Sequence, residues 1–225
     1  MFSEFIKVWK KKNLTSETVD QALKMLMKTR EMFVESVWSL RESDTGELRF
    51  DVYKHDKFIN KFERDIRKKL MTHLMIFDKS EIISGLTLAS VVIDIERIGD
   101  YTKNIADLAI QHKNKLSAGE FEEALVSIES RVKDFFEWTI KAFPESDVEL
   151  ARKVVNQYKD VSRDSAILDN TLVKGECNFS ISDAVTLALY ARFLKRVAAH
   201  LYNICTSIVN PFHRIGFKEK KKEIE

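Results

Sequence analysis

The residues best suited to chemistry lie in one short segment, where acidic and amide side chains recur every four residues. Glu96, Asp100 and Asn104 stand at positions i, i+4 and i+8. In a helix this spacing places them on one face, with neighbouring Cβ atoms about 5–6 Å apart. Two carboxylates at that separation can bind one hard cation such as Mg²⁺, Mn²⁺ or Ca²⁺. They can equally pair with Lys or Arg across a bundle, which is the commoner meaning of surface charges.

A second row of oxygen-bearing side chains precedes the first. Asp56, Asn60 and Glu63 stand at i, i+4 and i+7. They flank an apolar ridge with helical spacing, formed by Ile59, Phe62, Ile66, Leu70 and Leu74. The solvated flank of an amphipathic helix would give the same row. If the two segments form antiparallel helices, however, Asp56 and Asn60 can come opposite the first row.

The elements that must position these rows are helices. The 225 residues include only 6 Gly and 2 Pro, too few turn-formers for a sandwich or barrel. Apolar periodicity and turn residues predict helices over residues 15–42, 50–77, 81–113, 120–143, 146–173 and 180–209. We therefore expect an all-α fold of two tandem, pseudo-symmetric three-helix bundles. The bundles are expected over 14–115 and 119–213, between a basic amphipathic segment at 1–13 and a charged tail at 214–225.

An internal repeat supports the two-bundle architecture. The sixth predicted helix copies the third with an offset of 99 residues. The copied pairs include Ile82/Ile181, Thr87/Thr186, Leu88/Leu187, Ala89/Ala188, Arg97/Arg196, Asn104/Asn203 and Ile105/Ile204. The acids are not copied, because Lys195 replaces Glu96 and Ala199 replaces Asp100. A looser alignment places Tyr158 at the position of Asp56. Only the first bundle is thus expected to keep a full set of oxygen ligands.

These residues support a resemblance to a known family. Residues 95–100 (IERIGD) and 104–107 (NIAD) closely resemble the signature helix of the PhoU family, the phosphate uptake regulators. The pattern Asp56-x-x-x-Asn60, the chain length and the two-fold helical repeat agree with it. The resemblance covers essentially residues 14–213.

The resemblance implies a site and a function. Glu96 and Asp100 would be the motif carboxylates, with Asp56 and Asn60 as the facing pair. The metal would be a multinuclear iron or zinc cluster, whereas the all-oxygen ligand set also suits Mg²⁺ or Mn²⁺. The implied role is to restrain phosphate import and phosphate-starvation signalling in the cytoplasm. The second family motif falls on Leu194–Ile204, which holds His200 and Asn203 but lacks the carboxylates.

The implied partners are the ATP-binding subunit or permease of a phosphate transporter and a sensor histidine kinase. We also expect a homodimer, formed through an exposed helical face. The alternative is a metal-free helical adaptor, or an accessory protein of a different phosphate permease. An enzyme is not expected, because no Glu has a His three residues later, as in di-iron bundles, and no P-loop or nucleophile elbow occurs.

Composition excludes further classes. A formal net charge of +2, from 37 basic and 35 acidic residues, argues against nucleic-acid binding. Cys177 and Cys205 have no CxxC spacing, which favours a reduced cytoplasmic protein. No apolar run is long enough to span a membrane. Residues 1–12 place Phe2, Phe5, Ile6 and Trp9 before three lysines, so this segment can contact an anionic membrane or pack on the body as a short helix.

Overall fold

A computed structural model describes residues 14–76, 81–112, 114–175 and 178–219. Its six long helices are α2 (Leu14–Arg41), α3 (Val52–Ile76), α4 (Ile82–His112), α5 (Glu122–Glu145), α6 (Val148–Lys174) and α7 (Ile181–Val209). Two short 3₁₀ helices, η2 (Gly119–Phe121) and η3 (Phe212–Arg214), flank the second set. The amphipathic segment predicted at 1–13 lies outside the described residues.

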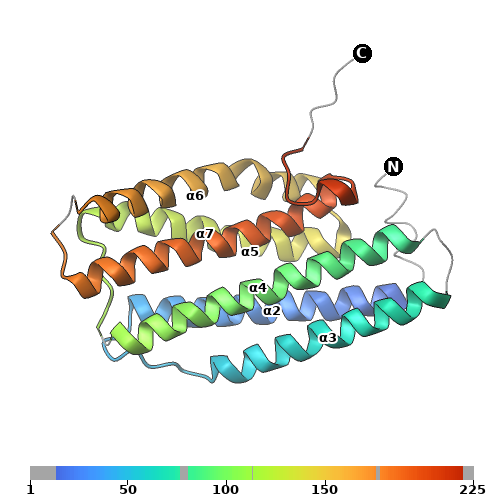
Figure 1. Ribbon diagram of the computed structural model, residues 1–225, viewed down its shortest axis with the longest axis horizontal. Helices are drawn as coiled ribbons and strands as arrows, with labels where there is room; N and C mark the ends of the chain where they lie inside the picture. The colour runs from blue at the N-terminus through green and yellow to red at the C-terminus, as the bar shows by residue number, and fades with distance from the viewer. Residues whose placement is uncertain (1–13, 77–80, 113, 176–177, 220–225) are drawn as a thin grey trace, which may run out of the picture.

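The helices form two halves, as the repeat predicts. In Figure 1, α2, α3 and α4 make up one half and α5, α6 and α7 the other, all running close to the long axis of the molecule. The halves meet along α4 and α7, with a smaller contact between α2 and α5. The prediction of an all-α fold of two three-helix bundles is confirmed. No helix within the described residues is both long and apolar enough to cross a membrane.

The repeated apolar positions form the core of each half. Leu88 in α4 and its counterpart Leu187 in α7 are fully buried, and so are Ile105 and Ile204. The two helices even begin at equivalent residues, Ile82 and Ile181. Of the predicted ridge on α3, the fully or nearly fully buried members are Ile59, Ile66 and Leu70. Burial of such side chains contributes about 1.5–3 kcal/mol each, so the repeated apolar frame is a major source of the stability of each bundle.

A mixed apolar and ionic cluster joins the two halves at the α2–α5 contact. The rings of Phe33 and Phe136 pack with centroids 5.1 Å apart. Arg41 Nε lies 3.0 Å from Glu129 Oε1, which also accepts a 2.7 Å hydrogen bond from the Tyr190 hydroxyl. Burial raises the pKa of Glu129, and the hydrogen bond from Tyr190 and the charge of Arg41 oppose that rise. Buried charges at this junction are thus paired, as burial requires.

The turn between α5 and α6 differs slightly from the predicted one. We expected the helix to end at Phe143–Pro144, but α5 continues to Glu145 with Pro144 in its last turn. The chain leaves the helix at Ser146, whose φ of 49° is left-handed. Asp147 then caps α6, because its side chain accepts hydrogen bonds from the backbone N–H groups of Glu149 and Leu150.

The described cysteine is inert. Cys205 is free and buried, 3.3 Å from the hydroxyl of Thr139, and burial raises its pKa to about 12. A buried neutral thiol is a packing residue rather than a nucleophile. Cys177 lies outside the described residues.

Candidate metal centre and its counterpart in the second repeat

The structure brings the two predicted rows together on the face shared by α3 and α4. Lys103 links them, because its Nζ donates to Asp56 Oδ2 at 3.1 Å and to Asp100 Oδ1 at 3.2 Å. Asn60 Nδ2 also reaches Asp56 Oδ2, at 3.4 Å. The predicted juxtaposition of Asp56 with Asp100 therefore occurs through a lysine that was not among the predicted site residues. Its i, i+3 spacing from Asp100 is an indication that could have identified it.

Two oxygen atoms of this face stand out because they lack partners. Asp56 Oδ1 and Asn60 Oδ1 are buried, and neither has a hydrogen-bond partner among the described residues. Leaving a buried acceptor unsatisfied costs about 1–3 kcal/mol, more for a charged group. Both atoms belong to residues predicted as ligands, and both are hard oxygen donors of the kind that divalent cations prefer.

Glu96 lies half-buried among other carboxylates. Burial raises its pKa, the nearby charge of Asp100 raises it further, and Arg97 opposes the shift. Arg97 is close to both acids, with Nε 3.6 Å from Glu96 Oε2 and Nη1 3.1 Å from Asp100 Oδ2. Glu63 and Asp56 add smaller contributions of the same sign. Negative charge is therefore concentrated here beyond what Arg97 neutralises.

The arrangement of these side chains fits a metal ion only in part. Within the described ranges, no group of three or more His, Cys, Asp or Glu side chains is placed to hold one ion. The ammonium of Lys103 instead stands between Asp56 and Asp100. Burial lowers the pKa of Lys103, but its hydrogen bonds and ion pairs with Asp56 and Asp100 outweigh burial and raise it. The donor types suit a hard cation, whereas Lys103 already neutralises part of the charge of Asp56 and Asp100.

Other members of the two predicted rows have different roles. Glu63 forms an i, i+4 ion pair with Arg67 at 2.8 Å. Asn104 makes no hydrogen bond to another side chain in the part of the chain that the structure describes. Glu96, Asp100, Asp56 and Asn60 thus remain the predicted ligand set.

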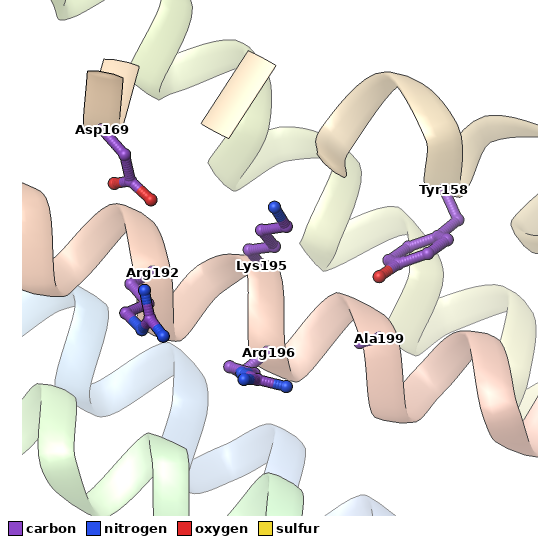
Figure 2. A pocket seen from close by; sticks show the side chains of 6 residues that line it. All are labelled: Tyr158, Asp169, Arg192, Lys195, Arg196 and Ala199. Atoms are coloured by element: carbon purple, nitrogen blue, oxygen red, sulfur yellow. The ribbon is translucent and has the colours of Figure 1, made fainter. Parts of the chain in front are cut away.

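The corresponding face of the second repeat carries the opposite charge. A cavity of about 190 Å³ opens between α6 and α7, lined by Tyr158, Asp169, Arg192, Lys195, Arg196 and Ala199. Figure 2 shows Tyr158 and Asp169 reaching from α6 toward α7, with Lys195 between them. Lys195 and Ala199 stand at the repeat positions of Glu96 and Asp100, and the looser alignment places Tyr158 at that of Asp56. No carboxylate pair is available there for a metal.

The acids on α6 do not replace the lost motif. Asp160 and Asp164 have i, i+4 spacing, but Arg163 pairs with Asp160 at 3.1 Å and with Asp164 at 2.9 Å. Arg131 on α5 pairs with Asp164 as well, at 2.9 Å. Both carboxylates are therefore held by arginines outside the residues that line the cavity.

His200 and Asn203, which belong to the second motif, connect the two halves instead. His200 Nδ1 lies 2.7 Å from Asp94 Oδ1, and Asn203 Nδ2 donates to the same oxygen at 2.9 Å. The ring of Tyr101 stacks on His200, with centroids 5.7 Å apart. Their contacts in the structure are those of an inter-bundle bridge.

Comparison with known proteins gives a consistent result. The family model of the PhoU domain matches this chain twice, over residues 22–109 and 125–208. A phosphate-specific transport system accessory protein PhoU homolog from Pseudomonas aeruginosa is 27% identical over 203 residues, covering 85% of this chain and 82% of the relative. PhoU homolog 1 from Thermotoga maritima is 28% identical over 196 residues, covering 83% and 82%.

Solved structures show the same fold. The crystal structure of PhoU from Pseudomonas aeruginosa superposes with a TM-score of 0.78 at 24% identity, covering 87% of this chain and 95% of that one. The phosphate transport system regulatory protein PhoU from Streptococcus pneumoniae gives a TM-score of 0.76 at 20% identity, covering 93% and 95%. At these identities the superpositions establish the six-helix architecture. The relatives' names are those of accessory and regulatory proteins, which confirms the prediction of a non-enzymatic protein.

Proposed function

Because this chain belongs to the PhoU family, with one PhoU domain in each half, we propose that it regulates phosphate uptake and phosphate-starvation signalling. The observation that carries the proposal is the double domain match over residues 22–109 and 125–208. The names of the relatives, accessory proteins of phosphate-specific transport systems, support it. The chain acts in the cytoplasm, where it binds the ATP-binding subunit or permease of a phosphate transporter, a sensor histidine kinase, or both. It works as a homodimer.

The regulatory proposal is tested in cells that lack the chain. We expect such cells to continue importing labelled phosphate when phosphate is abundant, and the intact chain to restore restraint. Unchanged uptake in the presence and absence of the chain would overturn the proposal. Copurification from crosslinked cells, with identification of the captured transporter or kinase subunit, assigns the partner.

We further propose that the α3–α4 face binds one or more divalent cations once Lys103 has moved aside. Asp56, Asn60, Glu96 and Asp100 would hold the metal. The unpartnered oxygens of Asp56 and Asn60 support this proposal, since a cation would satisfy both. The raised pKa of Glu96 also supports it, because an added cation would relieve the repulsion from neighbouring carboxylates. Such a metal would supply a structural cross-link between α3 and α4.

Metal analysis of protein purified without chelators tests the site. The Glu96→Ala/Asp100→Ala variant should lose its bound metal, because two of the four ligands are gone. A matched control exists in the same chain: Asp160→Ala/Asp164→Ala removes an i, i+4 acidic pair that arginines already hold. Full metal content in the first variant would place the metal elsewhere. Loss of metal on lowering the pH should begin above the range of an exposed Glu, because the pKa of Glu96 is raised and protons compete for it sooner.

A metal-free adaptor is the second proposal, and the position of Lys103 favours it. The ammonium already bridges Asp56 and Asp100, so the face is held together without an added ion. This alternative includes an accessory protein of a different phosphate permease. It predicts protein that contains no metal and whose melting temperature does not change on adding Mn²⁺, Fe²⁺ or Zn²⁺. A rise in melting temperature with any of these ions would exclude it, because a ligand that binds the native state stabilises it.

A further inference from the structure

The cavity between α6 and α7 concentrates positive charge. Arg192, Lys195 and Arg196 lie within one turn or so of α7, at i, i+3 and i+4, a spacing that places them on neighbouring positions of one helix face. No carboxylate of the described residues lies within ion-pair distance of any of the three. Asp169 is the acidic residue of the lining. Three cations and one carboxylate give the cavity a net charge of +2.

In the first repeat, the equivalent arginine has acidic neighbours that the second repeat lacks. Arg97, the counterpart of Arg196, lies beside Glu96 and Asp100. The second repeat keeps the arginine but replaces the two acids by Lys195 and Ala199. The exchange removes both counter-ions and adds a cation, while the shorter side chain at 199 leaves space. Loss of the two acids alone would be enough to give an ordinary solvated face. The exchange instead also adds Lys195, and the result is a concave site whose charge is positive where that of the first repeat is negative.

Asp169 supplies a second, independent feature of the cavity. Its Oδ1 is buried and has no hydrogen-bond partner within the described part of the chain. Burial raises the pKa of this carboxyl, and the charges of Lys195 and Arg192 oppose the rise. An ionised carboxylate can only accept hydrogen bonds. The cavity therefore offers three cations and one carboxylate oxygen that has no hydrogen-bond donor. An anion that carries its own hydroxyl group would pair with both.

We propose that the cavity between α6 and α7 binds a phosphate group, with Arg192, Lys195 and Arg196 on its anionic oxygens and Asp169 accepting a hydrogen bond from its P–OH group. Hydrogenphosphate carries the charge and the donor that this lining lacks. Sulfate has the same shape and charge but no proton at neutral pH, so Asp169 disfavours it. Tyr158 lies at the other end of the cavity from Asp169.

This inference rests on the proposed function and deepens it, because a regulator of phosphate uptake would then bind the transported ion directly. The test is independent of transport. Isothermal titration of the full chain with inorganic phosphate, in phosphate-free buffer of low ionic strength, measures binding at this site. We expect saturable binding, and at least about tenfold weaker binding in Lys195→Gln and Arg192→Gln, since each removes a charge-assisted hydrogen bond. Lys159→Gln on α6 is the matched control, since Lys159 is exposed and outside the lining.

Titrations with other ligands complete the test. Sulfate should bind more weakly than phosphate, and Asp169→Asn should reduce the difference because an amide can donate to either ion. Glycerol 3-phosphate and vesicles containing phosphatidic acid distinguish free phosphate from a phosphate group on a larger molecule; binding of any of these supports the site and names its source. Absence of binding by all of them, or equal binding by wild type and the Arg192→Gln/Lys195→Gln variant, would overturn the inference. Binding of a polyglutamate peptide alone would do the same and indicate a protein-docking surface.

The melting temperature of each variant shows whether it is folded. Arg192 is exposed and Lys195 half-buried, and neither is part of the core, so Gln should leave both variants native. Failure of this inference is distinguishable from failure of the proposed function. The phosphate-binding inference is tested by titration of the purified chain, through the second repeat. The proposed function is tested by phosphate transport in cells and by metal bound to the first repeat.

Discussion

The equivalent faces of the two repeats carry opposite charges, and each includes side chains of the other sign. On α3 and α4, Lys103 bridges Asp56 and Asp100 and Arg97 lies beside Glu96, whereas on α6 and α7 three cations line one cavity with Asp169. The apolar frames beneath the two faces are buried alike, as Leu88 and Leu187 show. The comparison teaches that the core specifies the bundle and does not depend on the charge above it. The charges are therefore free to serve ligands, and the two halves can serve different ones.

The contact between the halves shows a related difference. The offset of 99 residues relates Asp94 to Phe193 and Tyr101 to His200. Asp94 meets His200 at 2.7 Å, and the equivalent pair, Phe193 with Tyr101, packs with ring centroids 6.1 Å apart. The same two positions thus meet twice across α4 and α7, once as a polar pair and once as an aromatic pair. The bundles are related by an approximate two-fold axis whose two sides have diverged.

Converting the second face toward the first should produce the largest change. Lys195→Glu/Ala199→Asp places the acids of the first motif on α7. We expect phosphate binding to fall at least about 100-fold, because a cation is lost and two anions are added. Metal binding should not appear, because Arg192 and Arg196 remain to pair with the new carboxylates. Calorimetric titration with phosphate and with Mn²⁺ measures both. Binding of Mn²⁺ by this variant would show that the missing carboxylates alone explain why the second repeat does not bind metal.

The polar side of the inter-bundle contact is the next place to test. Asp94→Ala should lower the free energy of unfolding by about 1.5–3 kcal/mol, since Asp94 accepts hydrogen bonds from His200 and Asn203 in a partly buried site. Urea denaturation measures this loss. Asp94→Phe/His200→Tyr would copy the aromatic pair of the other side and should recover part of the stability. A double variant no more stable than Asp94→Ala would contradict the proposed equivalence of the two sides.

Part of the fold and part of the candidate site could be predicted from the sequence alone. The acidic face of α4 is predictable because its spacing is local, and the repeat is predictable because both copies keep the same buried frame. The role of Lys103 was missed because pairing with Lys or Arg was expected only in general terms, and Lys103 reaches Asp56 only once α3 and α4 have packed together. The cavity was missed for a different reason: Asp169 and Arg192 line one cavity only once α6 and α7 have packed in register. The pairing of Asp94 with His200 likewise depends on how two bundles dock, which no local pattern specifies.

Removal of the inner cation of the first face should strengthen metal binding. Lys103→Met keeps the length of the side chain but frees Asp56 and Asp100. We expect about tenfold tighter binding of Mn²⁺, corresponding to about 1.4 kcal/mol, because the ion no longer displaces an ammonium. The melting temperature of the variant should fall without metal and rise more than that of the wild type when Mn²⁺ is added. Lys57→Met on the exposed side of α3 is the control. Weaker binding in Lys103→Met would instead assign Lys103 to positioning the ligands.

The smallest expected effect concerns a glycine that distinguishes the two motif helices. Gly99 in α4 corresponds to Ala198 in α7, and both positions are buried in mid-helix. A Cβ at Gly99 would lie 3.5 Å from Ile59 Cδ1 and 3.7 Å from Thr29 Cγ2, which are ordinary contacts, so no close approach requires the glycine. Gly99→Ala should therefore raise the free energy of unfolding by about 0.5–1 kcal/mol, because Ala loses less backbone entropy in a helix. Urea denaturation of the metal-free protein measures the change. A loss of stability would mean that α4, unlike α7, must bend or shift near its acidic face. Gly99 would then serve the candidate metal site rather than the packing of the apolar core.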